Sequence, residues 1–573
     1  MDLTGIDDSE LRELIEEASS LFSLADDPPP SLVGLQRRIE ADRGRVEAAL
    51  RSVGYYAGTV DVAVDSAADP IEVRIAVEPG PRYTFGEVAV VGPEGRPLEE
   101  VTVERDALAL PQGAPALARD VVAAQSRLEE LVVARGYAFA EVPDREIVVD
   151  HSDRTMDVTF VVAPGDAVLL GPVTIRGLER VDEDLVRGRI PWDPGARFRP
   201  ELLARARERI SDLGPFASVR VDLAEETGAD GLTPVVVEVV ERPRRVIGAA
   251  VAFSTTEGLG VEAFWGHRNL FGGGEQFDIS GFASGIGVDS VSADVVEETD
   301  FGIDVEFRKP DVFAVDQTLI ASLELLTERP EAYDREAVTA SVRLSRVLSG
   351  GLTAGYGVTV ERSRIQEAER STTSTLFGVP LSVAWDVTDD LLDPSEGVRT
   401  ELLTTPWVQS GAADARFLAS RWTTSAYQSF LEDDLTLAGR VSFGSIAGAE
   451  VEEIPADKRF YAGGGGSIRG FGFQRVGPAD AFGDPRGGRS LFEIGAELRY
   501  RLTDTIGIVP FVDGGNVFDT TLPSFDEELK WGAGLGLRYF TGFGPLRADV
   551  AVPLNPEPGD DRWALYLSIG QAF

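Results

Sequence analysis

The sequence has no cysteine and only two histidines among its 573 residues. The lack of cysteine excludes disulfide bonds, thiolate metal ligands and thiol nucleophiles. The histidines, His151 and His267, are far apart in the chain, so few residues are available for imidazole catalysis. We therefore expect that the protein is not an enzyme, uses no cofactor and holds no metal ion.

Basic residues are scarce, and lysine is almost absent. Acidic residues number 96 and basic residues 54, which gives a formal net charge of −42, and the lysines are Lys309, Lys458 and Lys530. Such a charge repels phosphate backbones and excludes a nucleic-acid partner held by counterion release. Two interpretations of the acidity stay open. It is either the hydrated carboxylate surface of a protein from a saline habitat or a repulsive surface tuned to one partner.

Long hydrophobic runs are also missing. No stretch approaches the roughly 20 consecutive apolar residues that a membrane helix needs. No charged and apolar leader precedes Leu3, so no signal peptide is visible, and an exported protein would have had its leader trimmed or lost at a misassigned start. The 61 glycines and 29 phenylalanines are unusual for an acidic soluble enzyme. A β-barrel, whose strands of about 9–11 residues alternate between two faces, remains compatible with membrane insertion.

An internal repeat occupies roughly the first 245 residues. A charged helical stretch ends in glycine, close to an aromatic residue, at Gly54, Gly136 and Gly214, which lie 82 and 78 residues apart. Pro79-Gly80 and Pro164-Gly165 form a second marker with an offset of 85 residues. Each copy reads as strand, helix, helix, strand, strand, the order of a small α+β domain, and each glycine fits a helix C-cap with positive φ. The predicted copies span residues 1–81, 82–166 and 167–243.

Residues 244–573 read as strands separated by Gly-, Asp- and Pro-rich turns. In Phe492–Leu502 an apolar side chain alternates with Glu, Gly or Arg, and Trp531–Tyr539 has the same period of two. A soluble β-sandwich also alternates in this way. The charged second face and the aromatic residues near strand ends favour a wet lumen and a lipid interface. We therefore predict an all-β antiparallel transmembrane barrel of about 16 strands, with a soluble β-domain as the alternative.

Several motifs occur together in this second region. They are Arg459–Phe471 with four glycines before Arg-Gly-Phe, Asn269–Gly274 (Asn-Leu-Phe-Gly-Gly-Gly), the Asp-rich Asp386–Gly397, Phe511–Gly515 (Phe-Val-Asp-Gly-Gly) and the terminal Phe573. Taken in their order along the chain, these motifs resemble the BamA/TamA superfamily of outer-membrane assembly factors. The resemblance implies that the repeats are POTRA domains, and three copies are most similar to TamA-type members.

The resemblance also implies a role for Arg469, Gly470 and Phe471. In the superfamily this loop folds back into the barrel, where its arginine meets carboxylates of the inner wall, and the matching acids are Asp513 and Glu497. A guanidinium can bridge such carboxylates with parallel hydrogen bonds. The glycine run is not read as a phosphate-binding loop, because no Lys-Ser/Thr and no strand-to-helix context accompany it. The alternative is an arginine exposed on a mobile loop.

A barrel has one seam, where its first and last strands meet. We expect the first strand at about Val246–Phe253 and the last at Trp563–Phe573. The last strand carries an apolar set on one face, broken only by Gln571: Leu565, Leu567, Ile569 and Phe573. A weak seam would part and offer an edge strand to an incoming β-segment, so that backbone hydrogen bonds provide the affinity.

The resemblance implies a protein of the bacterial outer membrane with its POTRA domains in the periplasm. The expected function is the assembly, insertion or translocation of outer-membrane proteins of the autotransporter type. The expected partners are unfolded outer-membrane proteins, an inner-membrane-anchored AsmA/TamB-like protein and outer-membrane lipids. A BamA-like general insertase, a lipid-transport partner and a passive pore remain the alternatives.

Overall fold

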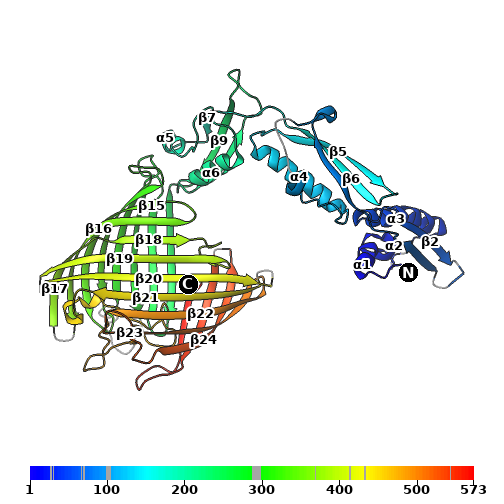
Figure 1. Cartoon of the computed structure of the whole chain (residues 1–573). Helices are drawn as coiled ribbons and strands as arrows, with labels where there is room; N and C mark the ends of the chain where they lie inside the picture. The colour runs from blue at the N-terminus through cyan, green and yellow to red at the C-terminus, as the bar shows by residue number, and fades with distance from the viewer. Residues whose placement is uncertain are drawn as a thin grey trace. The chain divides into compact units, whose positions relative to one another are not determined.

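The computed structural model describes residues 1–573 except 26, 28, 30, 66, 69–70, 99–104, 287–298, 368–369, 412–413, 432–433 and 543. Three small α+β units are followed along the chain by a closed antiparallel β-barrel (Figure 1). The predicted fold class is therefore confirmed. Each unit contains a three-stranded sheet within one of the predicted ranges, and the residues at which one unit gives way to the next stay predictions.

The first unit contains β1 (Asp2–Thr4), α1 (Ser9–Ala18), α2 (Ser20–Ser23), α3 (Leu32–Ser52), β2 (Thr59–Asp65) and β3 (Glu72–Glu78). The sheet order is β1-β3-β2, with β1 parallel to β3 and β2 antiparallel to it. Asp8 caps α1 by accepting hydrogen bonds from two amides of its first turn. Apolar residues at helical spacing on α1 and α3 face the sheet, and Ile15, Leu50 and Ile75 belong to the resulting core.

The second and third units repeat this sheet. The second contains β4 (Thr84–Val91), η1 (Pro93–Gly95), η2 (Arg105–Leu108), α4 (Ala118–Ala134), β5 (Glu141–Asp150) and β6 (Thr155–Ala163). The third contains β7 (Leu170–Arg176), α5 (Glu183–Arg187), α6 (Pro200–Ser211), β8 (Phe216–Leu223) and β9 (Thr233–Glu241). The sheet orders are β4-β6-β5 and β7-β9-β8, the same topology as in the first unit. In the described part of the second unit, the short 3-10 helix η2 takes the place of the predicted first helix.

The repeated glycine lies where successive units meet. Gly54 and Gly136 each accept a hydrogen bond through their carbonyl oxygen from an amide just before the first strand of the next unit, at 2.8 Å in both cases. Their φ angles are +95° and +103°, as predicted for a C-cap. The C-cap prediction is wrong for Gly214, whose φ is not in the left-handed region. Pro215 follows it, and the residue before a proline favours extended backbone.

The barrel is built from consecutive antiparallel strands. They are β10 (Arg245–Ser254), β11 (Gly258–His267), β12 (Gln276–Ile286), β13 (Asp300–Lys309), β14 (Gln317–Glu328), β15 (Asp334–Val347), β16 (Leu352–Glu367), β17 (Arg370–Gly378), β18 (Leu381–Asp386), β19 (Gly397–Gly411), β20 (Ala415–Phe430), β21 (Leu435–Ala447), β22 (Ser490–Thr503), β23 (Ile506–Phe518), β24 (Lys530–Thr541), β25 (Gly544–Pro553) and β26 (Ala564–Ile569).

The segments β17 and β18 form one strand of the wall. Both pair with β16 on one side and with β19 on the other, and Val379 and Pro380 interrupt them. Proline lacks an amide hydrogen and cannot donate to a ladder, so the break falls at this position. The described barrel therefore has 16 strands, as predicted. We call the end at which β10 begins the proximal end and the opposite end the distal end.

The two faces of the wall differ as the alternation predicts. On β22 the outward Leu498 and Tyr500 are 41% and 40% exposed, whereas the inward Glu497 and Arg499 are 1% and 7% exposed. Apolar side chains therefore lie on the outside of a closed sheet instead of against a second sheet, which rejects the soluble β-domain. Among the described residues, no helix is long and apolar enough to cross a membrane.

Candidate functional site

The long loop between β21 and β22, residues 448–489, reaches into the barrel, and we name it the lumen loop. Its Ile468 and Phe471 are 0% and 1% exposed. They form an apolar cluster with Leu491 of β22 and Val517 of β23. The tip of the lumen loop is thus fixed against the inner wall by apolar contacts as well as by the charges described next.

Arg469 lies at this tip and is 2% exposed. Its Nε and Nη2 donate to the two carboxylate oxygens of Asp513 at 2.6 and 2.9 Å, and its backbone amide donates to the same group at 3.2 Å. Its Nη1 donates to Glu497 at 2.7 Å and to Asp549 at 3.0 Å. The structure therefore brings Arg469 together with both acids named from the sequence, and the exposed-arginine alternative does not describe this side chain.

Sequence reasoning missed Asp549 and the arginines around it. Asp549 of β25 is 0% exposed, and it also pairs with Arg538 of β24 and Arg547 of β25. The guanidinium carbon of Arg469 lies 3.5 Å from the ring centre of Phe511, in a cation–π contact. Asp549 alternates with apolar residues in its strand, so the period of two already placed it on the inner face. Only the strand register of the closed barrel shows that Asp549 reaches Arg469.

Gly470 and Phe471 have different roles in the loop. The φ of Gly470 is +102°, and a Cβ there would lie 2.9 Å from the backbone carbon of Val552 on β25. A larger residue would therefore push the loop tip away from the wall. Phe471 contributes its ring to the apolar cluster of the tip.

A second group of charges fixes the other part of the lumen loop. Lys458 Nζ lies 2.6 Å from Glu361 of β16 and 2.9 Å from Asp457, whose side chain is 0% exposed. Arg335 of β15 is 3.1 Å from Asp457 and 3.2 Å from Glu361. The loop is thus anchored to β15 and β16 as well as to β22, β23 and β25. Sequence reasoning missed this group because its members are distant in the chain.

The seam between β10 and β26 is short. The described ladder contains the pairs Phe253–Leu567 and Ser254–Tyr566. In contrast, β10 pairs with β11 over its whole length, from Arg245 to Ser254. Leu567 and Ile569 are 40% and 51% exposed on the outer face, and Leu565 is half-buried. The seam therefore joins the two strands near their distal ends and leaves most of this edge of β10 without β26 as a ladder partner.

The prediction that Phe573 shares a face with these residues is wrong. The last strand ends at Ile569, and Gly570 has a φ of +92°, which interrupts the alternation. The carbonyl oxygen of Phe573 accepts a hydrogen bond from Arg499 at 2.7 Å, and its ring contacts Arg440 and Arg499. Because Arg499 points inward, the final residue is turned into the lumen. The predicted strand to Phe573 was therefore too long.

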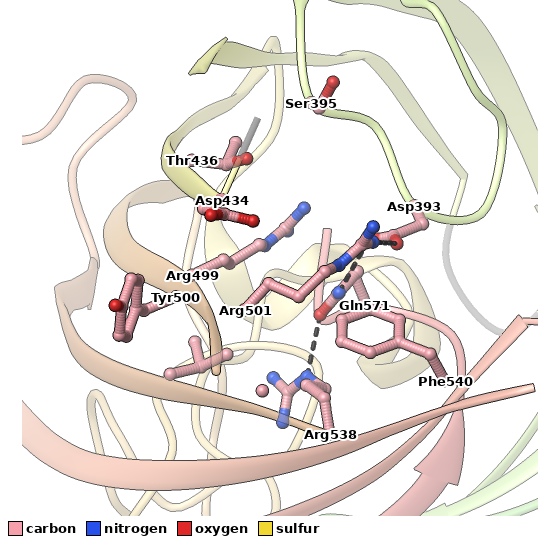
Figure 2. Close-up of a pocket in the computed structure, with 12 residues that line it drawn as sticks. Asp393, Ser395, Asp434, Thr436, Arg499, Tyr500, Arg501, Arg538, Phe540 and Gln571 are labelled. Atoms are coloured by element: carbon pink, nitrogen blue, oxygen red, sulfur yellow. Dashed lines mark hydrogen bonds and ion pairs between the residues drawn. The ribbon is translucent and has the colours of Figure 1, made fainter. Parts of the chain in front are cut away.

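The turn between β18 and β19, residues 387–396, closes over the proximal end of the lumen. Asp393 and Ser395 of this turn line a pocket together with Arg499, Arg538 and Gln571 (Figure 2). Gln571 donates to Asp393 at 2.8 Å and accepts from Arg538 at 2.8 Å. The turn thus holds the C-terminal segment within the proximal opening.

Asp389 shapes this turn. Its carboxylate accepts from the amides of Ser395 and Glu396 at 2.9 and 3.0 Å and from the Ser395 hydroxyl at 2.6 Å. Burial raises the pKa of Asp389, but these hydrogen bonds outweigh it and hold the pKa below its usual value. Asp389 is therefore a structural residue of the turn, and its carboxylate remains ionised at neutral pH.

Comparisons with known families match both parts of this architecture. A family model described as "Omp85 superfamily domain" matches residues 269–573, which is more than half of the chain. The chain belongs to the Omp85 superfamily. Two further models match its first and third units: "POTRA domain TamA domain 1" covers residues 1–79 and "Surface antigen variable number repeat" covers residues 168–242. An Omp85 barrel with POTRA units fits a bacterial outer membrane.

Curated relatives of this Omp85 chain are outer membrane protein assembly factors named BamA. The protein from Nitratidesulfovibrio vulgaris is 25% identical over 558 residues, which cover 93% of this chain and 68% of the relative. The protein from Neisseria meningitidis serogroup B is 21% identical over 568 residues, which cover 87% and 68%. The Omp85 chain is thus similar to these factors over nearly its whole length.

Solved structures agree with the fold of the Omp85 chain. The crystal structure of BamA from Haemophilus ducreyi lacking POTRA domains 1-3 has a TM-score of 0.64 at 17% identity and covers 85% of this chain and 100% of that chain. CdiB from Acinetobacter baumannii has a TM-score of 0.51 at 13% identity and covers 99% of each chain. At these identities the likeness concerns the fold alone.

Proposed function

We propose that this chain assembles or translocates outer-membrane proteins by offering the edge of β10 to an incoming β-segment. The observation that carries the proposal is the difference between the two neighbours of β10. It pairs with β11 from Arg245 to Ser254 but with β26 only at Phe253 and Ser254 within the described chain. An edge with exposed backbone donors and acceptors binds an extended segment with little demand on its sequence.

The cost of opening such a seam is small compared with that of any other interface in the wall. Two residue pairs supply few ladder hydrogen bonds, and each contributes about 0.5–1.5 kcal/mol net. Hydrocarbon does not tolerate an open edge, because each unpaired backbone group costs several kcal/mol there. The incoming segment would pair with these groups, which makes seam opening and substrate binding one coupled step.

The lumen argues against a passive pore. The lumen loop fills space inside the wall with buried side chains, among them Ile468, Arg469 and Phe471. The C-terminal segment and the turn at residues 387–396 lie across the proximal opening. We therefore propose a non-catalytic assembly factor and not a diffusion channel.

Within this function, a TamA-type role is the finer proposal. Its support is the number of α+β units and the match of the first unit to a TamA-type POTRA model. On this proposal the POTRA units lie in the periplasm, the substrates are autotransporter-like unfolded outer-membrane proteins, and an AsmA/TamB-like protein anchored in the inner membrane is the partner. Outer-membrane lipids surround the barrel.

A cysteine pair across the seam tests the proposal. Phe253 and Leu567 are opposite each other, so Phe253→Cys with Leu567→Cys lies within the Cα separation of about 4.4–6.8 Å that a disulfide needs. The chain has no cysteine of its own to interfere. In proteoliposomes, we expect the oxidised pair to abolish insertion of an unfolded outer-membrane protein and reduction to restore it.

The matched control places the pair elsewhere in the wall. Val261→Cys with Ala283→Cys joins β11 to β12, which also face each other in register. Its oxidation should leave insertion unchanged. Insertion that persists through the oxidised seam would contradict gating at β10 and β26.

A further inference from the structure

The tip of the lumen loop contacts both sides of the seam, at the turn after β10 and at β26. The amide of Gly465 donates to Glu257 Oε1 at 3.1 Å, and Glu257 lies in the turn directly after β10. The amide of Gly470 donates to the hydroxyl of Tyr566 on β26 at 3.1 Å. One short loop segment therefore binds the turn that ends the first strand through one amide and the last strand through another.

These contacts coincide with the paired part of the seam. Tyr566 is itself opposite Ser254, in one of the two residue pairs that join the strands. Beyond that pair, the amide of Thr255 donates to Leu565 O at 3.0 Å, and the amide of Leu565 donates to the Thr255 hydroxyl at 3.0 Å. The loop tip thus lies on the inner side of the seam at its distal end.

The loop approaches this position too closely for an ordinary residue. A Cβ on Gly465 would lie 2.8 Å from Cδ1 of the Tyr566 ring. Tyr566 is 4% exposed, so its ring is enclosed by the wall and the loop. A close backbone approach of this kind permits the loop amides to reach the side chains of Glu257 and Tyr566.

The same segment also carries Arg469, whose guanidinium binds β22, β23 and β25. None of the hydrogen bonds described for Arg469 goes to β10 or β26. The bonds to Glu257 and Tyr566 are therefore separate from the bonds that fix the loop to the wall. The loop therefore links strands β22, β23 and β25, which stay paired, to the seam between β10 and β26, which must open.

We propose that the lumen-loop tip is a clasp that holds the seam closed, with Glu257 and Tyr566 as positioning residues of the gate. This inference rests on the proposed function, because it identifies what controls opening of the same seam. When the tip withdraws, the turn after β10 and strand β26 each lose a bond to the loop at the same time. The two residue pairs and the Thr255–Leu565 hydrogen bonds that remain then separate more easily, and β10 becomes available along its whole length.

Variants at the two acceptors test the clasp without a substrate. Tyr566→Phe removes only the hydroxyl, and Glu257→Ala removes the carboxylate. Spin labels attached at Ile279→Cys on β12 and Leu535→Cys on β24 flank the seam at five strand spacings of about 4.8 Å each. Pulsed electron paramagnetic resonance in lipid bilayers then measures the separation across the seam.

We expect each variant to increase the ratio of long to short separations about fivefold, the change that corresponds to the net contribution of one hydrogen bond. Glu257→Gln retains an acceptor oxygen and should stay close to the parent distribution. Tyr539→Phe, which removes the same hydroxyl from the outer face of β24, is the matched control and should change nothing.

Heat-modifiable migration on gels confirms that each labelled variant is folded. Hydrogen exchange of the unsubstituted protein gives a second measurement, in which the amides of residues 463–471 should be protected as strongly as those of residues 252–256. An unchanged distribution in either Tyr566→Phe or Glu257→Ala, or loop amides that exchange much faster than the seam amides, would overturn the clasp. The spectroscopic result does not depend on insertion activity, so a protein that fails to insert substrates would refute the proposed function and leave the clasp to be judged separately.

Discussion

Arg469 makes bonds that depend on the shape of its guanidinium group. It donates two parallel hydrogen bonds to Asp513 and reaches Glu497 and Asp549 with a third nitrogen. Lysine keeps the positive charge but has a single donor group, which cannot form the same fork. Removing one partner of a buried ion pair costs about 3–5 kcal/mol because the other charges lose their compensation. The positive charge alone therefore does not explain why this position holds arginine and not lysine.

We expect Arg469→Lys to lower barrel stability by about 1–3 kcal/mol, because buried acceptors lose their donors. The temperature at which the folded gel band converts to the unfolded band should fall, while the POTRA units remain folded. Arg421→Lys is the control, because Arg421 has a side chain 52% exposed and lies 3.4 Å from Glu493. Equal conversion temperatures for the parent protein and Arg469→Lys would show that the fork is not needed.

Strand β9 of the third unit ends in a carboxylate that organises the chain before α5. Glu241 Oε1 accepts hydrogen bonds from the amides of Glu179, Arg180 and Val181 at 2.8, 2.9 and 2.9 Å. Burial acts to raise the pKa of Glu241, but these amides and the Arg180 guanidinium together lower it. A lowered pKa means that folding favours the ionised form, so the carboxylate stabilises this element where it is charged.

We expect Glu241→Gln to weaken this element by about 1–3 kcal/mol at neutral pH. The contribution of Glu241 is complete above its unfolded pKa of about 4.3 and is lost as the pH falls through the lower folded pKa. Hydrogen exchange of residues 179–181 at pH 7 and in acid measures the difference. Glu238→Gln, at a side chain 40% exposed, is the control. A variant whose exchange matches the parent at pH 7 would contradict the role of Glu241.

The net charge belongs to the molecule as a whole. With 96 acidic and 54 basic residues, repulsion acts across a folded chain that carries −42 charges. Salt screens this repulsion, since the Debye length falls from about 30 Å at 0.01 M to about 3 Å at 1 M. The buried ion pairs around Arg469 are screened far less, because they are enclosed by the wall and the loop.

We expect the melting temperature to rise with salt by at least about 4 °C between low and molar concentrations. The fluorescence of the seven tryptophans reports unfolding in such a series. An uncharged osmolyte at matched water activity is the control, because it does not screen charge. A melting temperature that is independent of salt would reject the saline-habitat interpretation and favour an acidic surface tuned to a partner.

Local patterns were sufficient to predict much of this molecule. A period of two along Phe492–Leu502 determines which side chains share a face of a strand, and closure of the sheet then places the apolar face outside. The spacing of Gly54 and Gly136 revealed repeated units, because each glycine ends a helix at the same point of the same topology. These properties depend on neighbours in the chain.

Contacts between distant strands required the tertiary structure. Asp549 and Tyr566 face inward by the period of two in their strands, and Lys458 lies in the lumen loop. Only the closed barrel determines that these three residues meet Arg469, Gly470 and Glu361 respectively. At the C-terminus, Gly570 reverses the expected direction of Phe573 through a backbone angle that alternation does not contain. The sequence by itself therefore determined the repeats, the barrel and its faces, which follow from local periodicity. The seam length, the second anchor and the clasp were decided by closure, because closure sets which residues far apart in the chain become neighbours.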